Sequence, residues 1–73
     1  MSAPEAPTGV VITCHDGTTV PAELSYRGRR FDWRRGAFEH QWIVTACVHA
    51  TDCAYVSVKT LPPRTSLVIE LML

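Results

Sequence analysis

The chain has 73 residues, of which 47% are hydrophobic and 19% are charged, and its seven basic residues balance seven acidic residues. This length predicts one hydrophobic core and no second domain, and the apolar content excludes a disordered chain. A core of this size supplies only about 3–5 kcal/mol of stability, so we expect further stabilisation from self-association, a metal or a disulfide.

The first eight residues (MSAPEAPT) are rich in Pro, Ala and Ser, which predicts a flexible N-terminal arm. They contain neither a basic nor an apolar segment, so no export signal is expected. A single small β domain is then expected over residues 9–73. No uncharged apolar stretch approaches the roughly 20 residues that a membrane span needs. The three cysteines, Cys14, Cys47 and Cys53, are an odd number, which favours reduced thiols over a disulfide framework. We therefore expect a cytoplasmic protein.

The first predicted structure is a β-hairpin. Residues 9–15 (GVVITCH) are rich in β-branched side chains, and the turn pair Asp16-Gly17 follows directly. The return strand is predicted over residues 19–26, where apolar and other residues alternate. Pro21 has no amide hydrogen to donate, so this strand is expected to lie at a sheet edge or to begin with a bulge.

A long loop is predicted over residues 27–38, with a short strand allowed at 31–33. The longest apolar run, residues 41–50, is predicted to be the central strand of the domain. Its alternation places Ile43, Thr45, Cys47 and His49 on one face and Trp42, Val44, Ala46 and Val48 on the other.

The rest of the chain also predicts strands. Thr51-Asp52 is expected to form a turn, residues 55–59 a strand that ends before Pro62-Pro63, and residues 66–73 a final strand. No window of eleven residues has a helical period. The sequence therefore predicts an all-β fold with five or six antiparallel strands, either a small SH3-like barrel, which we favour because it hides its edges, or a compact sandwich.

The most distinctive local feature is a cluster of arginine and aromatic residues over residues 26–35 (YRGRRFDWRR). Arginines can hold phosphates, and aromatic rings can stack on bases, so the cluster is typical of single-stranded nucleic-acid binding. The alternative is a solvated loop in which the rings plug the end of the barrel and Asp32 and Glu39 pair with arginines. Because the net charge is zero, the second interpretation is favoured. The candidate partner-binding residues are Arg27, Arg29, Arg30, Phe31, Trp33, Arg34 and Arg35.

Metal binding and catalysis are weakly supported. Soft ligands are available for zinc in Cys14-His15, Cys47, His49 and Cys53, but their spacing matches neither paired C-x-x-C motifs nor a zinc finger. We assign no metal site and no cofactor. Cys47 or Cys53 could pair with His40 or His49 as nucleophile and base, yet the chain has no phosphate-binding loop, H-E-x-x-H or G-x-S-x-G motif. The sequence therefore predicts a protein that is not an enzyme.

The final strand is mostly apolar on both of its faces. Leu67, Ile69, Leu71 and Leu73 alternate with Val68, Glu70 and Met72. Such a strand needs either a closed barrel or a partner, so homodimerisation or strand addition by another protein is one interpretation, with Leu71 and Leu73 as contact residues. The other interpretation is that it is the last core strand of the monomer.

Four short motifs resemble small proteins of mycobacteriophages and other actinobacterial phages. They are a D-G-T turn at 16–18, a P-x-x-L-x-Y strand at 21–26, a W-x-V strand at 42–44 and an L-P-x-x-T turn at 61–65. The arginine-rich segment 27–35 departs from the more acidic loop expected there. No activity can be carried over from that group. The resemblance implies a phage accessory protein in the host cytoplasm that binds a host or phage partner.

These observations favour a non-catalytic binding module that acts through protein–protein contacts, including contacts with itself. The alternative is a nucleic-acid-binding β-barrel that uses the arginine-aromatic segment.

Overall fold

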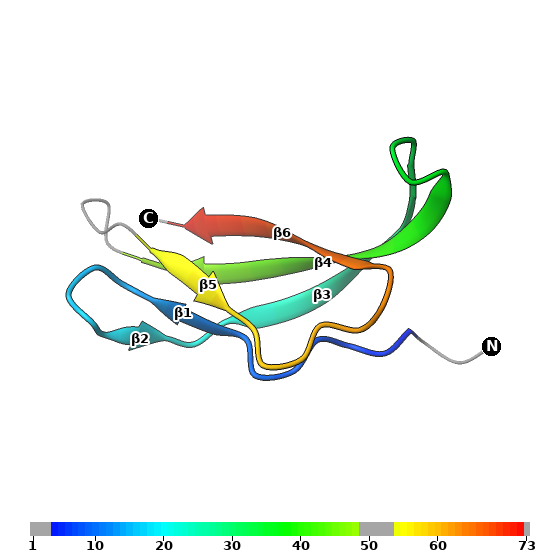
Figure 1. The fold of residues 1–73 in the computed structure, drawn as a ribbon. Helices are drawn as coiled ribbons and strands as arrows, with labels where there is room; N and C mark the ends of the chain where they lie inside the picture. Colours follow the sequence, from blue (N-terminus) through cyan, green and yellow to red (C-terminus); the bar gives the residue numbers. More distant parts are fainter. Residues whose placement is uncertain (1–3, 49–53, 73) are drawn as a thin grey trace.

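The structure is a computed structural model that describes residues 4–48 and 54–72. Within these ranges the chain forms six strands and no helix, which confirms the predicted all-β class (Figure 1). The strands are β1 (Val11–Thr13), β2 (Thr19–Val20), β3 (Glu23–Asp32), β4 (Ala37–Cys47), β5 (Tyr55–Ser57) and β6 (Thr65–Met72). The described ranges therefore contain no helix that could cross a membrane.

The strands form two three-stranded sheets, with the orders β2-β1-β5 and β3-β4-β6. The favoured prediction of a closed SH3-like barrel is wrong, because no described strand pairs with strands of both sheets. The chain leaves the first sheet after Val20 and enters the second at Glu23, so Pro21 lies in the break between the two. The prediction of one return strand over residues 19–26 is therefore wrong, because residues 23–26 belong to β3 of the other sheet. β2 is an edge strand, one of the two positions that Pro21 indicated. A compact sandwich, the second predicted architecture, describes the arrangement loosely.

The pairing of β4 with β6 is parallel, whereas the sequence was expected to give antiparallel strands throughout. The register runs from His40↔Thr65 to Cys47↔Met72. Between these two strands the chain forms β5, which pairs with β1 in the other sheet. Because the chain crosses to the first sheet and returns, β6 enters the second sheet from the same end as β4.

The predicted hairpin at Asp16-Gly17 is confirmed. Gly17 has a φ of +91°, a conformation that glycine adopts readily. The Asp16 carboxylate accepts hydrogen bonds from the backbone N–H and the hydroxyl of Thr18, and the Cys14 N–H donates to the Thr18 carbonyl. These bonds close the turn and set β1 against β2.

Most of the predicted loop at residues 27–38 is strand, and that prediction is wrong. β3 continues to Asp32 and pairs with β4 as far as Asp32↔Ala37, leaving a four-residue turn at 33–36. The ladder shifts register between Tyr26 and Gly28, so Arg27 is the extra residue of a β-bulge. Gly28, the residue after the bulge, has a φ of +119°. Glycine adopts this backbone conformation readily, whereas a residue with a side chain would be strained in it.

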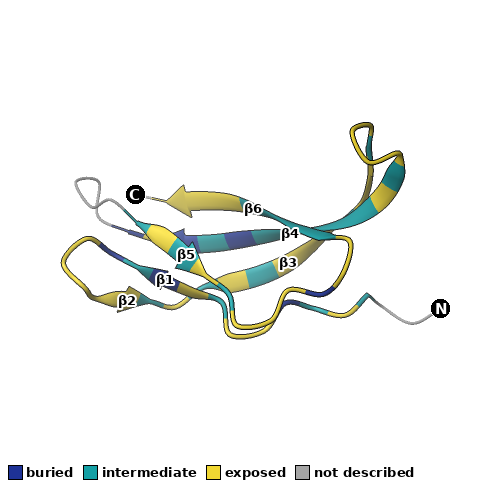
Figure 2. Ribbon diagram, viewed as in Figure 1, coloured by how far each residue is buried: buried dark blue, intermediate teal, exposed yellow. Residues whose placement is uncertain are grey.

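The core lies between the two sheets at the end of the second sheet away from this turn (Figure 2). Val44, Ala46 and Val48 share one face, as the alternation predicted, and the structure shows that this face is the core side, with Ile12 and Cys14 packed against it from the first sheet. These five residues form the buried core in the described part of the chain, and Ile12 and Val44 among them are fully buried. His49, Cys53 and the predicted Thr51-Asp52 turn lie outside the described residues.

The start of the chain runs beside the segment that follows β5. Thr8 pairs with Thr60, and Pro7 is buried. Gly9 lies directly against Lys59. The mobility of an arm over residues 1–8 stays a prediction.

Candidate binding surfaces

The β3–β4 hairpin extends beyond the first sheet as a hairpin arm, defined here as residues 26–42 (Figure 1). The molecule measures 38 × 24 × 17 Å, and its radius of gyration is 13.4 Å. A compact chain of this length has a radius of gyration of about 11 Å. The molecule is therefore elongated, and the arm presents two faces of its own.

The register of the ladder assigns each arm residue to a face, because directly paired residues project to the same side of a sheet. One face carries Tyr26, Arg29, Phe31, Phe38, His40 and Trp42. The opposite face carries Gly28, Arg30, Asp32, Ala37, Glu39 and Gln41. Alternation from Val44 to Trp42 shows that the first set continues the core side of the sheet. We call it the aromatic face and the second set the polar face.

The rings of the aromatic face contact one another. Phe31 lies edge-on to Phe38, with 5.0 Å between ring centroids, and to Trp33 of the turn, with 4.7 Å. The Arg29 guanidinium carbon lies 5.2 Å from the centroid of the Phe38 ring. Closer to the core, the Tyr26 ring lies 5.3 Å from the ring of Trp42, and its hydroxyl forms a 2.8 Å hydrogen bond with Nδ1 of His40.

Four rings of the arm are exposed, although apolar side chains on the core side of a sheet are normally covered. Trp33 is 86% exposed, Phe38 53%, Tyr26 41% and Phe31 38%. The first sheet is too short to reach them, since its strands have two or three residues each. Phe31 and Trp33 therefore do not plug the end of a barrel, as one interpretation of the sequence required.

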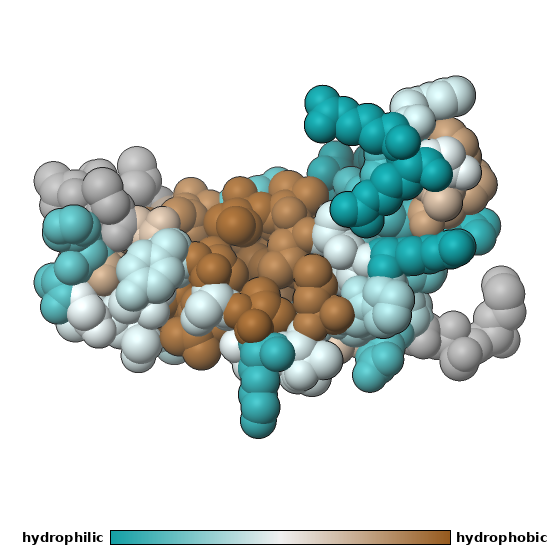
Figure 3. Space-filling model, viewed as in Figure 1, coloured by the Kyte–Doolittle hydropathy of each residue, from teal (hydrophilic) through white to brown (hydrophobic). Residues whose placement is uncertain are grey.

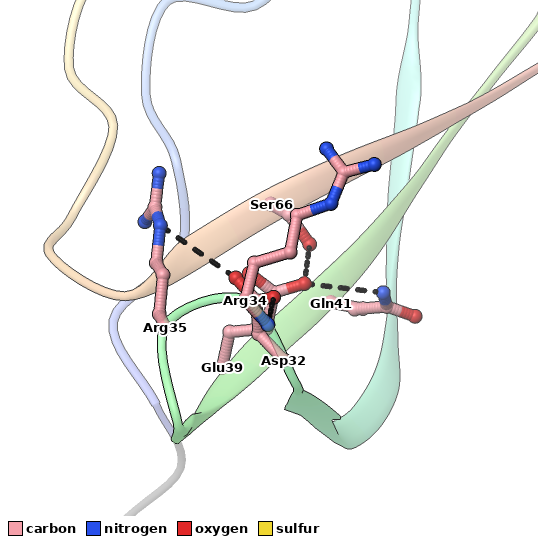
Figure 4. A network of polar contacts seen from close by, with 6 residues as sticks. All are labelled: Asp32, Arg34, Arg35, Glu39, Gln41 and Ser66. Carbon is pink, nitrogen blue, oxygen red and sulfur yellow. Dashed lines mark hydrogen bonds and ion pairs between the residues drawn. The ribbon is translucent and has the colours of Figure 1, made fainter.

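The polar face holds the acidic residues of the arm in local contacts (Figure 4). Asp32 accepts a 3.0 Å hydrogen bond from the Arg34 N–H and forms a 3.6 Å ion pair with Arg35. Glu39 accepts hydrogen bonds from Gln41 and from Ser66 of β6. The predicted pairing of acidic residues with arginines is thus found at Asp32, whereas the Glu39 carboxylate joins β4 to β6.

The structure divides the predicted arginine-aromatic cluster into separate groups. Arg29 and Phe31 lie on the aromatic face, and Arg30 lies on the polar face. The remaining members occupy the bulge or the turn, namely Arg27, Trp33, Arg34 and Arg35. Sequence reasoning missed Phe38, His40 and Trp42 as members of the aromatic face. The glycine inside the strand, Gly28, was the available signal for a bulge that brings them together.

The second candidate surface is β6, the last strand of the β3-β4-β6 sheet. Among the described residues only β4 pairs with it. Its odd-numbered side chains share the core side with Val44 and Ala46, yet Ile69 is 49% exposed and Leu71 38%. Leu67 packs against the core. Leu73, the other predicted contact residue here, lies outside the described residues.

The exposed part of β6 belongs to a larger apolar surface. Figure 3 shows hydrophobic side chains gathered across the middle of the molecule, while hydrophilic side chains dominate the end that carries the arm. Val11 of the first sheet is also 38% exposed. Contiguous apolar surface of this kind marks contact sites more often than isolated exposed residues do.

The cysteines do not assemble a reactive site in the described residues. Cys14 is buried in the core and Cys47 is exposed at the end of β4. His40 is seven positions from Cys47 along β4, which corresponds to about 23 Å in an extended strand, so these two cannot act as base and nucleophile. Within residues 4–48 and 54–72, no group of three or more potential ligands could hold a metal ion.

No protein-family model, curated protein or solved structure matches the chain. What the protein does is therefore inferred from the hairpin arm and from β6.

Proposed function

We propose that the chain is a non-catalytic binding module that acts through protein–protein contacts, and that β6 is the strand to which a partner adds. The observation that carries this proposal is an eight-residue strand at the edge of its sheet, with apolar side chains left exposed on its core side. Unpaired strand edges present rows of N–H and C=O groups that accept a further strand.

The hydrogen bonds of β6 indicate which of its backbone groups are available. The carbonyls of Arg64 and Met72 accept bonds from His40 and Val48, so even-numbered residues direct their peptide groups toward β4. Peptide groups alternate in direction along a strand. Thr65, Leu67, Ile69 and Leu71 therefore direct their N–H and C=O groups toward the free edge.

The partner proposed is a second copy of the chain, paired through an antiparallel β6–β6 contact. A two-fold axis at Ile69 places Ile69 opposite its own copy and Leu71 opposite Leu67, so the core-side apolar residues cover one another. It also places Glu70 opposite Val68. A register that set Glu70 against Glu70 would bring like charges together and is disfavoured. The available N–H and C=O groups at Ile69 match those that such a pair exchanges.

The same edge could serve a partner protein in the host. The resemblance to small phage proteins supports a role as a phage accessory protein in the host cytoplasm, and the small buried core supports a module that gains stability by association.

The test is the oligomeric state of matched variants, measured by light scattering coupled to size-exclusion chromatography. Ile69→Lys places two lysines at the centre of the proposed contact, so we expect the dimer to be lost. Met72→Lys changes an exposed residue of the same strand that lies on the other face, opposite Ser66 in the proposed register, and should leave the dimer intact.

A second pair of variants tests the backbone contact. Ile69→Pro removes an N–H that points to the free edge and should leave a folded monomer, whereas Val68→Pro removes an N–H that points to β4 and should reduce thermal stability. A wild-type chain that is monomeric at high concentration, or an Ile69→Lys variant that still dimerises, would refute the proposal.

A further inference from the structure

We propose that the aromatic face of the hairpin arm binds single-stranded nucleic acid, a function separate from the association through β6. Tyr26, Phe31 and Phe38 of this face, together with Trp33, offer exposed surfaces of the kind on which unpaired bases stack. The rings of Tyr26, Phe31 and Phe38 are held by a two-stranded ladder, and Trp33 lies in the turn that joins its strands. The edge-to-face contacts of Phe31 with Phe38 and Trp33 fix the relative orientation of these three rings.

The distribution of charge supports a polyanionic ligand. Five of the seven basic residues of the chain lie on the arm, together with only two acidic residues, Asp32 and Glu39. Both acidic side chains lie on the polar face, where Asp32 contacts Arg34 and Arg35, and Glu39 contacts Gln41 and Ser66. The aromatic face itself carries Arg29 and no carboxylate. The net charge of zero is therefore the sum of a basic arm and a more acidic remainder of the chain.

Arg29 is placed to hold a phosphate beside a stacked base. Its guanidinium lies over the Phe38 ring, and its side chain projects from the aromatic face between Tyr26 and Phe31 along β3. A guanidinium can donate two parallel hydrogen bonds to phosphate oxygens while it remains stacked on a ring. Arg34 extends the positive charge into the turn beside Trp33.

The exposed rings favour a single strand over a duplex. The base faces of a duplex are occupied by stacking on neighbouring bases, so they cannot engage Trp33 or Phe38 without unstacking. An acidic protein segment would use the arginines but would leave the ring faces without a matching surface. The combination of stacking rings and a basic edge is typical of proteins that bind single strands with little sequence preference.

Binding is measured by fluorescence anisotropy of a labelled oligothymidylate with the purified full chain, at low and at moderate salt. We expect affinity that falls as salt rises. Trp33→Ala and Phe38→Ala each remove a stacking surface and should weaken binding roughly 5- to 150-fold. Circular dichroism of each variant confirms that it remains folded.

Arg29 and Arg30 provide a matched pair, because they are neighbours in sequence on opposite faces of the same strand. We expect Arg29→Ala to weaken binding about tenfold or more, since it removes a charged group at the stacking surface. Arg30→Ala removes the same charge from the polar face and should leave the affinity within about threefold.

Three outcomes would overturn the proposal. The first is that the wild-type chain does not bind the oligonucleotide. The second is that heparin or duplex DNA displaces the labelled oligonucleotide as effectively as an unlabelled single strand does, which would indicate attraction to any polyanion. The third is that Arg29→Ala and Arg30→Ala reduce the affinity equally. The monomeric Ile69→Lys variant should still bind through its arm, so failure of self-association and failure of nucleic-acid binding are separable.

Discussion

Two glycines of this chain share one left-handed conformation but differ in their surroundings. Gly9 and Gly36 both have a φ of +65°. A Cβ atom at Gly9 would overlap the Cβ of Lys59, where the start of the chain runs beside the segment after β5, whereas a Cβ at Gly36 would meet nothing. The pair therefore separates the cost of the backbone conformation from the cost of the close approach.

We predict that Gly9→Ala lowers the free energy of unfolding more than Gly36→Ala does. The left-handed conformation should cost about 1–2 kcal/mol in both variants. Gly9→Ala should lose about 1–3 kcal/mol more, because Lys59 and the segment after β5 must shift to admit the methyl group. Urea unfolding of the two variants measures the difference, and equal losses would show that residues 8–9 are not held against residues 59–60.

At the scale of single residues, the turn at Asp16-Gly17 could be predicted from the sequence. Asp16 and Gly17 predicted a tight turn because their side-chain chemistry and conformational freedom act locally, and the structure forms that turn. The residues that form the aromatic face could not be predicted in the same way. It depends on which residues of β4 lie opposite β3, and this pairing is a property of two segments together.

At the scale of elements, a single bulge explains why residues 27–38 were expected to form a loop. Tyr26, Arg29 and Phe31 share a face although their spacing is three and then two, so simple alternation fails at Arg27. Because the alternation of apolar and polar side chains is interrupted at Arg27, the sequence pattern does not predict a strand there. The parallel direction of β6 could not be predicted either, because alternation shows which side chains share a face but not which way the strand runs.

We predict that the bulge, rather than any contact of Gly28, makes this glycine necessary. In the complete chain, Gly28→Ala should lower the free energy of unfolding by about 1–2 kcal/mol, since its φ of +119° strains any side chain and no atom lies within reach of the added methyl group. Deleting Arg27 would let Gly28 follow Tyr26 in a regular ladder with the same partners on β4. In that background, Gly28→Ala should be neutral or stabilising in thermal melts.

The outcome that contradicts this prediction is an equal cost of Gly28→Ala in both backgrounds. The deletion also bears on the arm as a binding surface, because it preserves the pairing of Phe31 with Phe38 but removes the local twist that a bulge adds. A changed affinity for single strands with unchanged pairing would show that the curvature of the arm contributes to binding.

At the scale of the whole molecule, the main difference from expectation is that the sheets do not close. The described residues form two separate sheets, with β2 and β5 at the edges of one and β3 and β6 at the edges of the other, and a projecting arm. The break at Pro21 and Ala22 directs β3 into the second sheet, and Pro21 was recognised only as an edge or bulge signal. An open arrangement leaves few residues fully buried, so the isolated chain is expected to be only marginally stable.

Marginal stability and self-association should then be linked, and this leads to a prediction about melting temperature. If the folded form is a β6–β6 dimer and the unfolded form is a monomer, a tenfold rise in concentration stabilises the dimer by about 1.4 kcal/mol, or about 0.7 kcal/mol per chain. For a domain of this size, that change corresponds to a rise of roughly 3–6 °C in Tm. We expect wild type and Met72→Lys to show this rise, and Ile69→Lys to melt at a lower temperature that is independent of concentration. A wild-type Tm that stays constant across a hundredfold dilution would show that the edge of β6 remains unpaired in solution, because a monomer gains nothing from mass action.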